Sequence, residues 1–243
     1  TDLRCEYLRN PLGIGETRPR FSWTIVSGRR SAVQAAYRLL VAEDAGFSRV
    51  LWDSGKTESG ESVQVAAGEP FSRSRFRYYY RVEVWGAGGE YAISDEEAWW
   101  ETGLIDPAEW RAVWIAAPAR VIPPDSLQSP MFRNEVAVPA DRPLRRARLY
   151  ITARGLYRCT LNGVRVGDGE FTPGWTSYRR RLQVQTYDAT PLLRPGPNVV
   201  GLLLGDGWYR GSLTWDLRRN SYGDRLKALA QLHLEYEDGG EDV

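Results

Sequence analysis

The feature that most constrains the fold is the alternation of apolar and polar residues, with a period of two, along nearly the whole chain. This period is typical of strands that bury one face, whereas an amphipathic helix repeats its apolar residues about every 3.6 positions. Clear examples are residues 36–42, 77–85, 182–188 and 228–236. The sequence therefore predicts an all-β fold and contains no repeated helical pattern.

The first of two expected domains covers residues 1–105. Its predicted strands are short and separated by turn clusters, at 20–25, 36–42, 51–55, 62–65, 77–85 and 99–102. About seven short strands in roughly 100 residues are typical of an immunoglobulin-like sandwich. Because the cysteine pair of antibody domains is missing, the pattern favours the fibronectin type III variety.

The second expected domain covers residues 106–243. The alternation lapses after Leu104, and a loop-like stretch rich in Pro and Ser runs from 118 to 130, so we place the boundary near residue 105. Asn162-Gly163 between alternating segments predicts a type I′ hairpin, whose central residues both need positive φ. Further strands are predicted at 131–138, 148–153, 157–161, 164–167, 182–188, 198–205 and 228–236. We expect a jelly-roll-like antiparallel sandwich.

The last predicted strand runs into Glu237-Asp238-Gly239-Gly240, a hairpin turn signal that needs a return strand. We therefore expect a domain truncated at its C-terminal end, with one edge of strand 228–236 unpaired. Open backbone groups at such an edge pair readily with other chains. The expected consequence is that the fragment self-associates more readily than a chain extended through the return strand.

Charge and hydropathy exclude several classes of function. Lys and Arg total 32 against 31 Asp and Glu, giving a net charge of +1, so no whole-chain field attracts nucleic acid or anionic lipid. No stretch approaches the roughly 20 apolar residues of a membrane-spanning helix. The sequence thus predicts a soluble protein without nucleic-acid or membrane partners, and it leaves a cytoplasmic or a secreted location open.

The scarcity of cysteine and histidine limits the possible chemistry. Cys5 and Cys159 are the two cysteines, too few for a disulfide framework, and we expect two buried free thiols and no metal site built on them. His233 is the single histidine, so a Ser-His-Asp triad would have to include it. The alternation of strand 228–236 places His233 on the solvent side, which argues against catalysis.

Acidic residues offer no identifiable catalytic pair. Glycoside hydrolysis needs two carboxylates facing each other across a pocket, one protonated and one ionised. Asp206, Asp216 and Asp224 fall in loops of the second domain and could cluster, but turn formation accounts for loop aspartates equally well. We therefore predict no catalytic residue within this chain.

Residues 205–211, Gly-Asp-Gly-Trp-Tyr-Arg-Gly, form the most distinctive motif. No Lys-Ser/Thr follows, so it is not a phosphate loop. One interpretation is a structured turn in which Trp208 is mostly buried. The other is a sugar platform, because aromatic faces bury the C–H side of a pyranose while Asp, Asn and Arg bind its hydroxyls. The candidate sugar-binding residues are Asn162, Trp175, Tyr178, Asp206, Trp208, Tyr209, Arg210, Trp215, Tyr222 and Asp224.

These motifs resemble the N-terminal region of bacterial α-L-rhamnosidases of glycoside hydrolase family 78. The resemblance in the second domain rests on residues 147–157, 161–167, 172–178, 185–188, 205–211 and 222–226. Residues 3–7, 10–14, 18–23 and 51–56 resemble the fibronectin-like module that opens many of these enzymes. The resemblance therefore spans essentially the whole chain.

The resemblance implies a parent enzyme that hydrolyses terminal α-L-rhamnosides with inversion, in a downstream (α/α)6 barrel of the same polypeptide. That barrel is the implied partner, and its catalytic residues have no counterparts here. The resemblance implies that some relatives hold a calcium-assisted rhamnose site in this part of the protein, but no ligand residue matches securely here. We therefore predict no cofactor and assign no metal ligand, and a structural or sugar-site calcium stays open.

Three functions follow, in order of preference. The chain consists of non-catalytic modules that brace or flank the catalytic barrel, or it is an autonomous carbohydrate-binding module for rhamnose-containing glycans, or it is a small self-sufficient glycosidase. A glycan titration separates the first two. The parent's substrate, whether a flavonoid glycoside, pectin or another rhamnoside, is not determined by this sequence.

Overall fold

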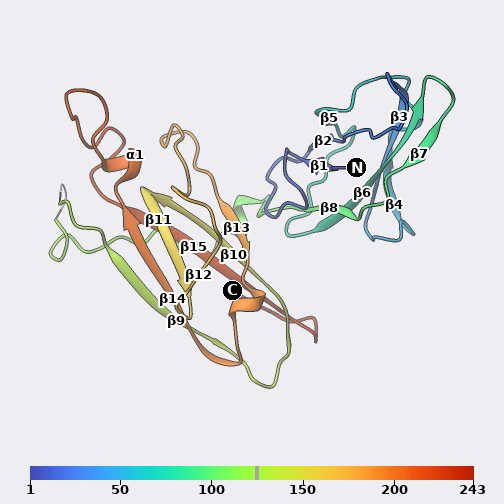
Figure 1. Cartoon of the computed structure of the whole chain (residues 1–243). Helices are drawn as coiled ribbons and strands as arrows, with labels where there is room; N and C mark the ends of the chain where they lie inside the picture. The colour runs from blue at the N-terminus through green and yellow to red at the C-terminus, as the bar shows by residue number, and fades with distance from the viewer. Residues whose placement is uncertain (124–125) are drawn as a thin grey trace. The chain divides into compact units, whose positions relative to one another are not determined.

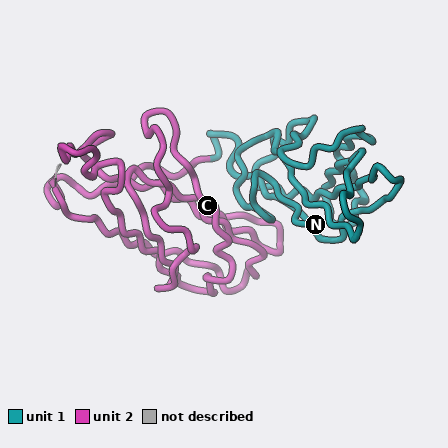
Figure 2. Tube along the Cα trace, turned by 45° about the horizontal axis from the view of Figure 1, so that its top comes forward, with its two compact units in different colours: residues 1–109 teal, residues 110–243 magenta. Residues whose placement is uncertain are grey.

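A computed structural model of the chain describes residues 1–123 and 126–243. Backbone contacts divide these residues into the compact units Thr1–Glu109 and Trp110–Val243, each with a hydrophobic core of its own (Figure 2). Nearly all regular structure is antiparallel β-sheet, which confirms the predicted all-β fold class. Among the described residues, no helix is long and apolar enough to cross a membrane.

The first unit is built from two sheets that share one core. The smaller sheet has the order β1 (Arg4–Cys5), β2 (Arg20–Ser22), β5 (Val65–Ala66). The larger sheet has the order β4 (Val50–Asp53), β3 (Gln34–Ala42), β6 (Arg77–Gly86), β7 (Tyr91–Ile93), and β8 (Ala98–Glu101) also pairs with β6 (Figure 1). The short strands β1 and β7 carry too little alternation to be predicted from the sequence.

Trp100 lies at the centre of the first core, fully buried. Its ring stacks on Tyr78 at a centroid distance of 4.9 Å and meets Phe21 and Phe71 edge-on at 5.3 Å. The period-two alternation of β6 places Tyr78 and Tyr80 on the same inner face. Large aromatic rings therefore fill the space between the two sheets.

The second unit is an antiparallel sandwich in which strand neighbours are mostly distant in sequence, as a jelly-roll-like order requires. One sheet has the order β13 (Gln185–Asp188), β10 (Leu144–Arg154), β15 (Lys227–Tyr236), β16 (Glu241–Asp242). The other has the order β12 (Val164–Arg165), β11 (Leu156–Leu161), β14 (Gly196–Gly205), β9 (Met131–Val138) (Figure 1).

The alternation along β10 and β15 places apolar residues on the core side, as predicted. Leu149 and Ile151 of β10 face the core together with Leu232 and Leu234 of β15. The Asn162-Gly163 turn joins β11 and β12 with φ values of 52° and 83°, which agrees with the predicted I′ hairpin.

The prediction that His233 faces solvent is wrong. His233 lies on the face of β15 away from the core, as the alternation indicated, but it is only 5% exposed. Its ring meets Tyr150 edge-on at 5.5 Å, and its Nε2 lies 2.7 Å from Gln231 Nε2. Gln231 also accepts hydrogen bonds from the backbone N–H groups of Arg111 and Ala112. Residues following the first unit therefore cover this face, which alternation alone could not reveal.

The end of β15 also differs from the prediction. The expected turn at 237–240 is present, and β16 pairs with Leu234 and Glu235 of β15, so this part of the edge is not unpaired. Nearer its start, Ala228 of β15 pairs with Ile115. The prediction of an unpaired edge is therefore wrong at these two places.

The helical segments are short: η1 (Pro107–Glu109), η2 (Thr190–Leu192) and α1 (Gly207–Arg210). Helix α1 forms the structured turn expected for residues 205–211, as a single helical turn. Both cysteines of the sequence lie in the described part of the chain and are buried free thiols, as predicted. Burial raises the pKa of Cys159 to about 12 and that of Cys5 further, so both thiols are protonated and inert at neutral pH.

Candidate functional site

The loops of the second unit bring several aromatic side chains together. Phe171 and Trp175 lie on the loop between β12 and β13, Trp208 lies on α1, and Tyr222 precedes β15. We call these four residues the aromatic platform. Phe171 was not among the predicted site residues, because nothing in its sequence surroundings separates it from a core phenylalanine.

The platform is held by ring contacts. Trp175 stacks on Trp208 at 5.7 Å with an interplanar angle of 7°, and Phe171 meets Trp208 edge-on at 6.0 Å. The indole N–H of Trp175 donates to the Tyr222 hydroxyl at 3.2 Å. Trp175 is nevertheless 55% exposed and Phe171 66% exposed. A stacked and exposed indole of this kind suits the apolar face of a sugar ring.

Hydrogen bonds to the sheet fix the loop that carries Phe171 and Trp175. The Thr172 carbonyl accepts a hydrogen bond from the Tyr157 N–H at 2.9 Å, and the Thr172 hydroxyl donates one to the Tyr157 carbonyl at 3.1 Å. Gln185 of β13 donates its amide to the Pro173 carbonyl at 3.2 Å. Gln185 in turn accepts from the Tyr157 hydroxyl at 3.0 Å. The loop is therefore ordered before any ligand binds, which lowers the entropic cost of binding.

Tyr178 and Tyr209 belong to the core beneath the platform rather than to its surface. Tyr178 is 5% exposed and Tyr209 6%, and their rings meet edge-on at 5.3 Å. Burial raises the pKa of Tyr178, whose hydroxyl donates to the Gly174 carbonyl. Gly223 packs so closely on the Tyr209 hydroxyl that a Cβ there would clash. Their predicted role as sugar contacts is therefore wrong.

Trp208 is partly buried and packs against the core of the second unit, which agrees with the prediction that it is mostly buried. In the helical turn of α1 the next two residues, Tyr209 and Arg210, are buried more deeply than Trp208. In an extended segment, neighbouring side chains point to opposite faces, so the strand-like pattern did not indicate that two consecutive side chains are buried here.

Asp206 and Arg210 form a buried ion pair instead of a sugar site. Arg210 is 1% exposed, and its Nε donates to Asp206 at 2.6 Å while one of its terminal nitrogens donates to the Gln128 carbonyl at 2.9 Å. Arg219 donates to the second carboxylate oxygen of Asp206 at 2.9 Å. With both of its oxygens engaged by guanidinium groups, Asp206 is suited to hold α1 in place rather than to contact a sugar.

The remaining predicted residues lie apart from this pair. Asn162 uses its side-chain amide within the fold, donating to Leu192 and Asn198 and accepting from the Val199 N–H, so it is not available to a sugar. Trp215 is fully exposed in the loop bridged by Leu213 and Arg218. Asp224 is exposed. No contact brings Trp215 or Asp224 to the platform among the described residues.

Acidic and other metal-binding side chains do not cluster in the described part of the chain. Among residues 1–123 and 126–243, no group of three or more His, Cys, Asp or Glu side chains could hold a metal ion. Asp216, a loop carboxylate, accepts a hydrogen bond from Thr214, which lowers its pKa.

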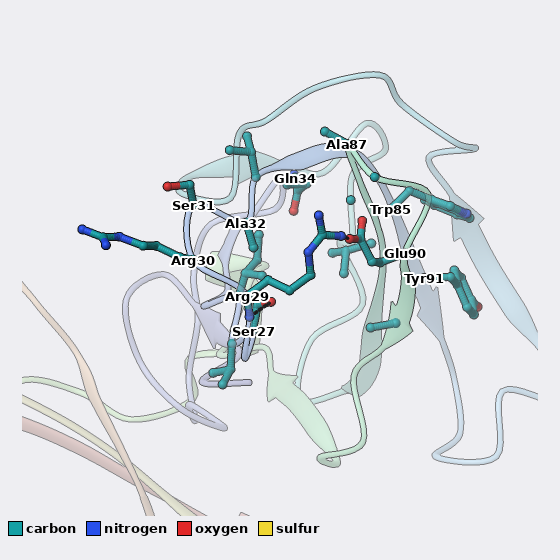
Figure 3. Close-up of a pocket in the computed structure, with 17 residues that line it drawn as sticks. Ser27, Arg29, Arg30, Ser31, Ala32, Gln34, Trp85, Ala87, Glu90 and Tyr91 are labelled. Atoms are coloured by element: carbon teal, nitrogen blue, oxygen red, sulfur yellow. Dashed lines mark hydrogen bonds and ion pairs between the residues drawn. The ribbon is translucent and has the colours of Figure 1, made fainter.

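The first unit contains a separate pocket of about 200 Å³ at one end of its larger sheet. Figure 3 shows Arg29 and Glu90 pointing toward each other across it and Arg30 pointing away. Arg29 and Glu90 form an ion pair. Because its central cation is already neutralised, the pocket offers no charge to recruit an anionic ligand.

Comparison with models of known protein families identifies a family for each of the two sandwiches. The family described as the Rha78A-like N-terminal immunoglobulin domain matches residues 1–106, and the family described as the α-L-rhamnosidase N-terminal domain matches residues 142–243. The chain belongs to the N-terminal domains of the α-L-rhamnosidase family. An α-L-rhamnosidase from Alteromonas sp. is 33% identical to this rhamnosidase region over 94% of the chain, and one from Formosa agariphila is 31% identical over 96%.

Solved rhamnosidase structures agree over the whole length of this region. The Streptomyces avermitilis α-L-rhamnosidase complexed with L-rhamnose has a TM-score of 0.87 and 25% identity, and the Aspergillus terreus α-L-rhamnosidase has a TM-score of 0.84 and 35% identity. Each match covers 100% of this chain, but 40% and 28% of those structures. Among the curated relatives, the rhamnosidase region spans between 26% and 39% of the full length.

Proposed function

We propose that this chain supplies two non-catalytic N-terminal modules, residues 1–105 and 106–243, to a longer α-L-rhamnosidase. The parent hydrolyses terminal α-L-rhamnosides with inversion, in a downstream (α/α)6 barrel that these modules brace or flank. The observation that carries the proposal is the match of both sandwiches, in order, to the start of rhamnosidases more than twice as long. The capture of Asp206 by two arginines supports it, because that loop carboxylate is engaged in holding α1.

The isolated chain is expected not to hydrolyse an aryl α-L-rhamnoside. Inverting hydrolysis requires two carboxyl groups about 6.5–9.5 Å apart across the scissile bond, and Asp206, the carboxylate of the 205–211 motif, is bound by Arg210 and Arg219. The measurement is release of the aryl group by purified chain, with the full-length parent as the positive control. Turnover that survives repurification and disappears on substituting Asp206, Asp216 or Asp224 would overturn the proposal.

A second candidate function is recognition of rhamnose-containing glycans at the aromatic platform. The observation that favours it is the exposed indole of Trp175, stacked on Trp208 and fixed by a preordered loop. A similar solved rhamnosidase was crystallised with L-rhamnose, so the sugar is a natural first probe. Neighbouring polar groups include the Tyr222 hydroxyl and Arg179, which donates to the Ser221 carbonyl.

Replacing Trp175 with alanine is expected to weaken binding of a rhamnoside by about 2- to 13-fold, the equivalent of one aromatic contact worth roughly 0.5–1.5 kcal/mol. Because Trp175 is largely exposed, the melting temperature should change little. Titration calorimetry of both proteins measures the loss, and Trp215→Ala is the matched control because Trp215 is exposed away from the platform. Equal affinities for the Trp175→Ala variant and the unsubstituted chain would assign the platform a purely structural role.

A further inference from the structure

The carboxamide of Gln231 holds the segment that follows the first unit against β15. Its Oε1 accepts hydrogen bonds from two consecutive backbone N–H groups, that of Arg111 at 2.6 Å and that of Ala112 at 2.9 Å. Further along, Ile115 and Ala228 exchange backbone hydrogen bonds at 2.9 and 3.0 Å. We call residues 111–115 the connecting segment. Because both donors at its start are main-chain N–H groups, they fix which way the Gln231 amide points.

The amide nitrogen of Gln231 is directed at the single histidine of the sequence. Gln231 Nε2 lies 2.7 Å from His233 Nε2, which is a hydrogen-bond distance. A side-chain amide nitrogen can only donate, so His233 Nε2 has to be the acceptor in this contact. A ring nitrogen accepts only when it carries no proton. The docked connecting segment therefore requires a neutral imidazole with its one proton on Nδ1.

Protonation of His233 is incompatible with this arrangement. Both ring nitrogens of an imidazolium carry a proton, so two donors would face each other at 2.7 Å. Turning the Gln231 amide over would offer its oxygen to the ring, but it would set the amide nitrogen against the N–H groups of Arg111 and Ala112. Either orientation leaves donors opposed between two buried side chains, where unsatisfied polar groups are costly.

The charged groups on this face of the sheet also disfavour an imidazolium. Arg148 of β10 lies directly opposite the imidazole, is buried, and pairs with Asp188 at 2.8 Å. Glu235, two positions along β15, accepts from Arg145 at 2.7 Å and from Arg146 at 2.6 Å. Both of these carboxylates are thus engaged by arginines. Like charges directly opposite each other on paired strands are destabilising, so Arg148 opposes a second cation here.

The other elements at this site add no anion. Tyr150 of β10 meets the imidazole edge-on at 5.5 Å, and its ring is fully buried. Arg111 is the ionisable residue of the connecting segment, and its side chain is exposed. Neither residue supplies a carboxylate that would hold a proton on the ring. Geometry and charge therefore both favour the neutral histidine while the segment is docked.

We propose that Gln231 and His233 form a pH-sensitive latch that holds the connecting segment on β15 when His233 is neutral and releases it when His233 is protonated. An exposed histidine titrates at about pH 6.5. The docked state excludes the proton and the released state can take it up, so docking is complete well above that pH and is lost progressively below it. The inference goes beyond the proposed function and is independent of it, because neither hydrolysis nor glycan binding is involved.

The ring nitrogens of His233 test the first step. Nitrogen NMR of the chain at about pH 7.5 distinguishes a protonated from a bare ring nitrogen. Because the sequence contains one histidine, its ring signals need no further assignment. We expect the proton on Nδ1 and a bare Nε2. A proton on Nε2 at this pH would overturn the latch.

Hydrogen exchange at the Arg111 and Ala112 amides tests the release. After correction for the intrinsic pH dependence of exchange, we expect the protection of both amides to fall about 30-fold from pH 7.5 to pH 5, since release takes up one proton at a group that titrates at about pH 6.5. The amide of Ile151, in the middle of β10 and paired with β15, is the internal reference and should keep its protection. A fall shared by Ile151, or no fall at residues 111 and 112, would contradict the proposal.

Two variants separate the latch from a general effect of acid. His233→Gln keeps an acceptor oxygen for Gln231 but does not titrate, so protection at residues 111 and 112 should no longer depend on pH. Gln231→Glu is the second variant, should the first fail to fold, because a carboxylate accepts from both the segment and an imidazolium. Glu237→Gln, on an exposed residue just after β15, is the control and should keep the fall. A fall of unchanged size in His233→Gln or Gln231→Glu would rule out the latch.

Discussion

Replacing Trp100 with alanine is expected to destabilise the first unit by about 3–5 kcal/mol, the cost of removing a large buried aromatic ring. Trp100 is fully buried and touches Phe21, Phe71, Tyr78 and Tyr80, so the cavity would lie at the centre of the core. Urea unfolding of the whole chain, followed by circular dichroism, measures the change.

Trp215→Ala is the matched control for this prediction. Trp215 is fully exposed, and surface substitutions usually change stability by no more than about 0.5 kcal/mol. If the Trp100→Ala and Trp215→Ala variants unfold at the same urea concentration, the packing described for the first core is incorrect.

Replacing Asp206 with alanine is expected to destabilise the second unit by a similar amount, about 3–5 kcal/mol. The change removes the carboxylate that neutralises Arg210, whose side chain is 2% exposed, and leaves a buried charge without its partner. The double variant Asp206→Ala/Arg210→Ala should recover part of the loss, because it removes the stranded charge as well.

The exposed pair Arg133 and Glu135 provides the control, since both side chains are more than half exposed. Glu135→Ala should cost about 0–1 kcal/mol. Thermal unfolding of the four proteins measures the differences. If the double variant is less stable than Asp206→Ala by the full cost of a second truncation, Asp206 and Arg210 do not stabilise the fold as a coupled pair.

Local sequence rules were sufficient wherever a strand or turn depends on its own residues. The alternation of β10 and β15 predicted their core faces, and Asn162-Gly163 predicted its hairpin, because pleat and positive φ are local properties. Strand β1 could not be predicted in the same way, because it is only two residues long and is defined by its pairing with the later strand β2. The turn signal at 237–240, in contrast, did indicate a return strand, and β16 follows that turn.

The candidate site was predicted less well, because side-chain roles there depend on tertiary neighbours. Trp175 and Trp208 were expected on one sugar platform, and the structure stacks them, whereas Tyr209 and Arg210 point inward from a helical turn that the sequence did not indicate. His233 shows the same limit: a residue on the outer face of a strand becomes buried when residues elsewhere in the chain cover that face.

We predict that this region carries no catalytic group. Turnover by the full-length parent tests this prediction most directly. Of the three loop aspartates singled out in the sequence, Asp216 and Asp224 lie outside the structural pair with Arg210, so the variant Asp216→Asn/Asp224→Asn removes them while preserving shape. We predict that kcat for an aryl α-L-rhamnoside stays within about twofold of the unsubstituted parent, because general acid–base groups typically contribute at least about 100-fold. A loss of about 100-fold or more in a variant with an unchanged melting temperature would contradict the claim.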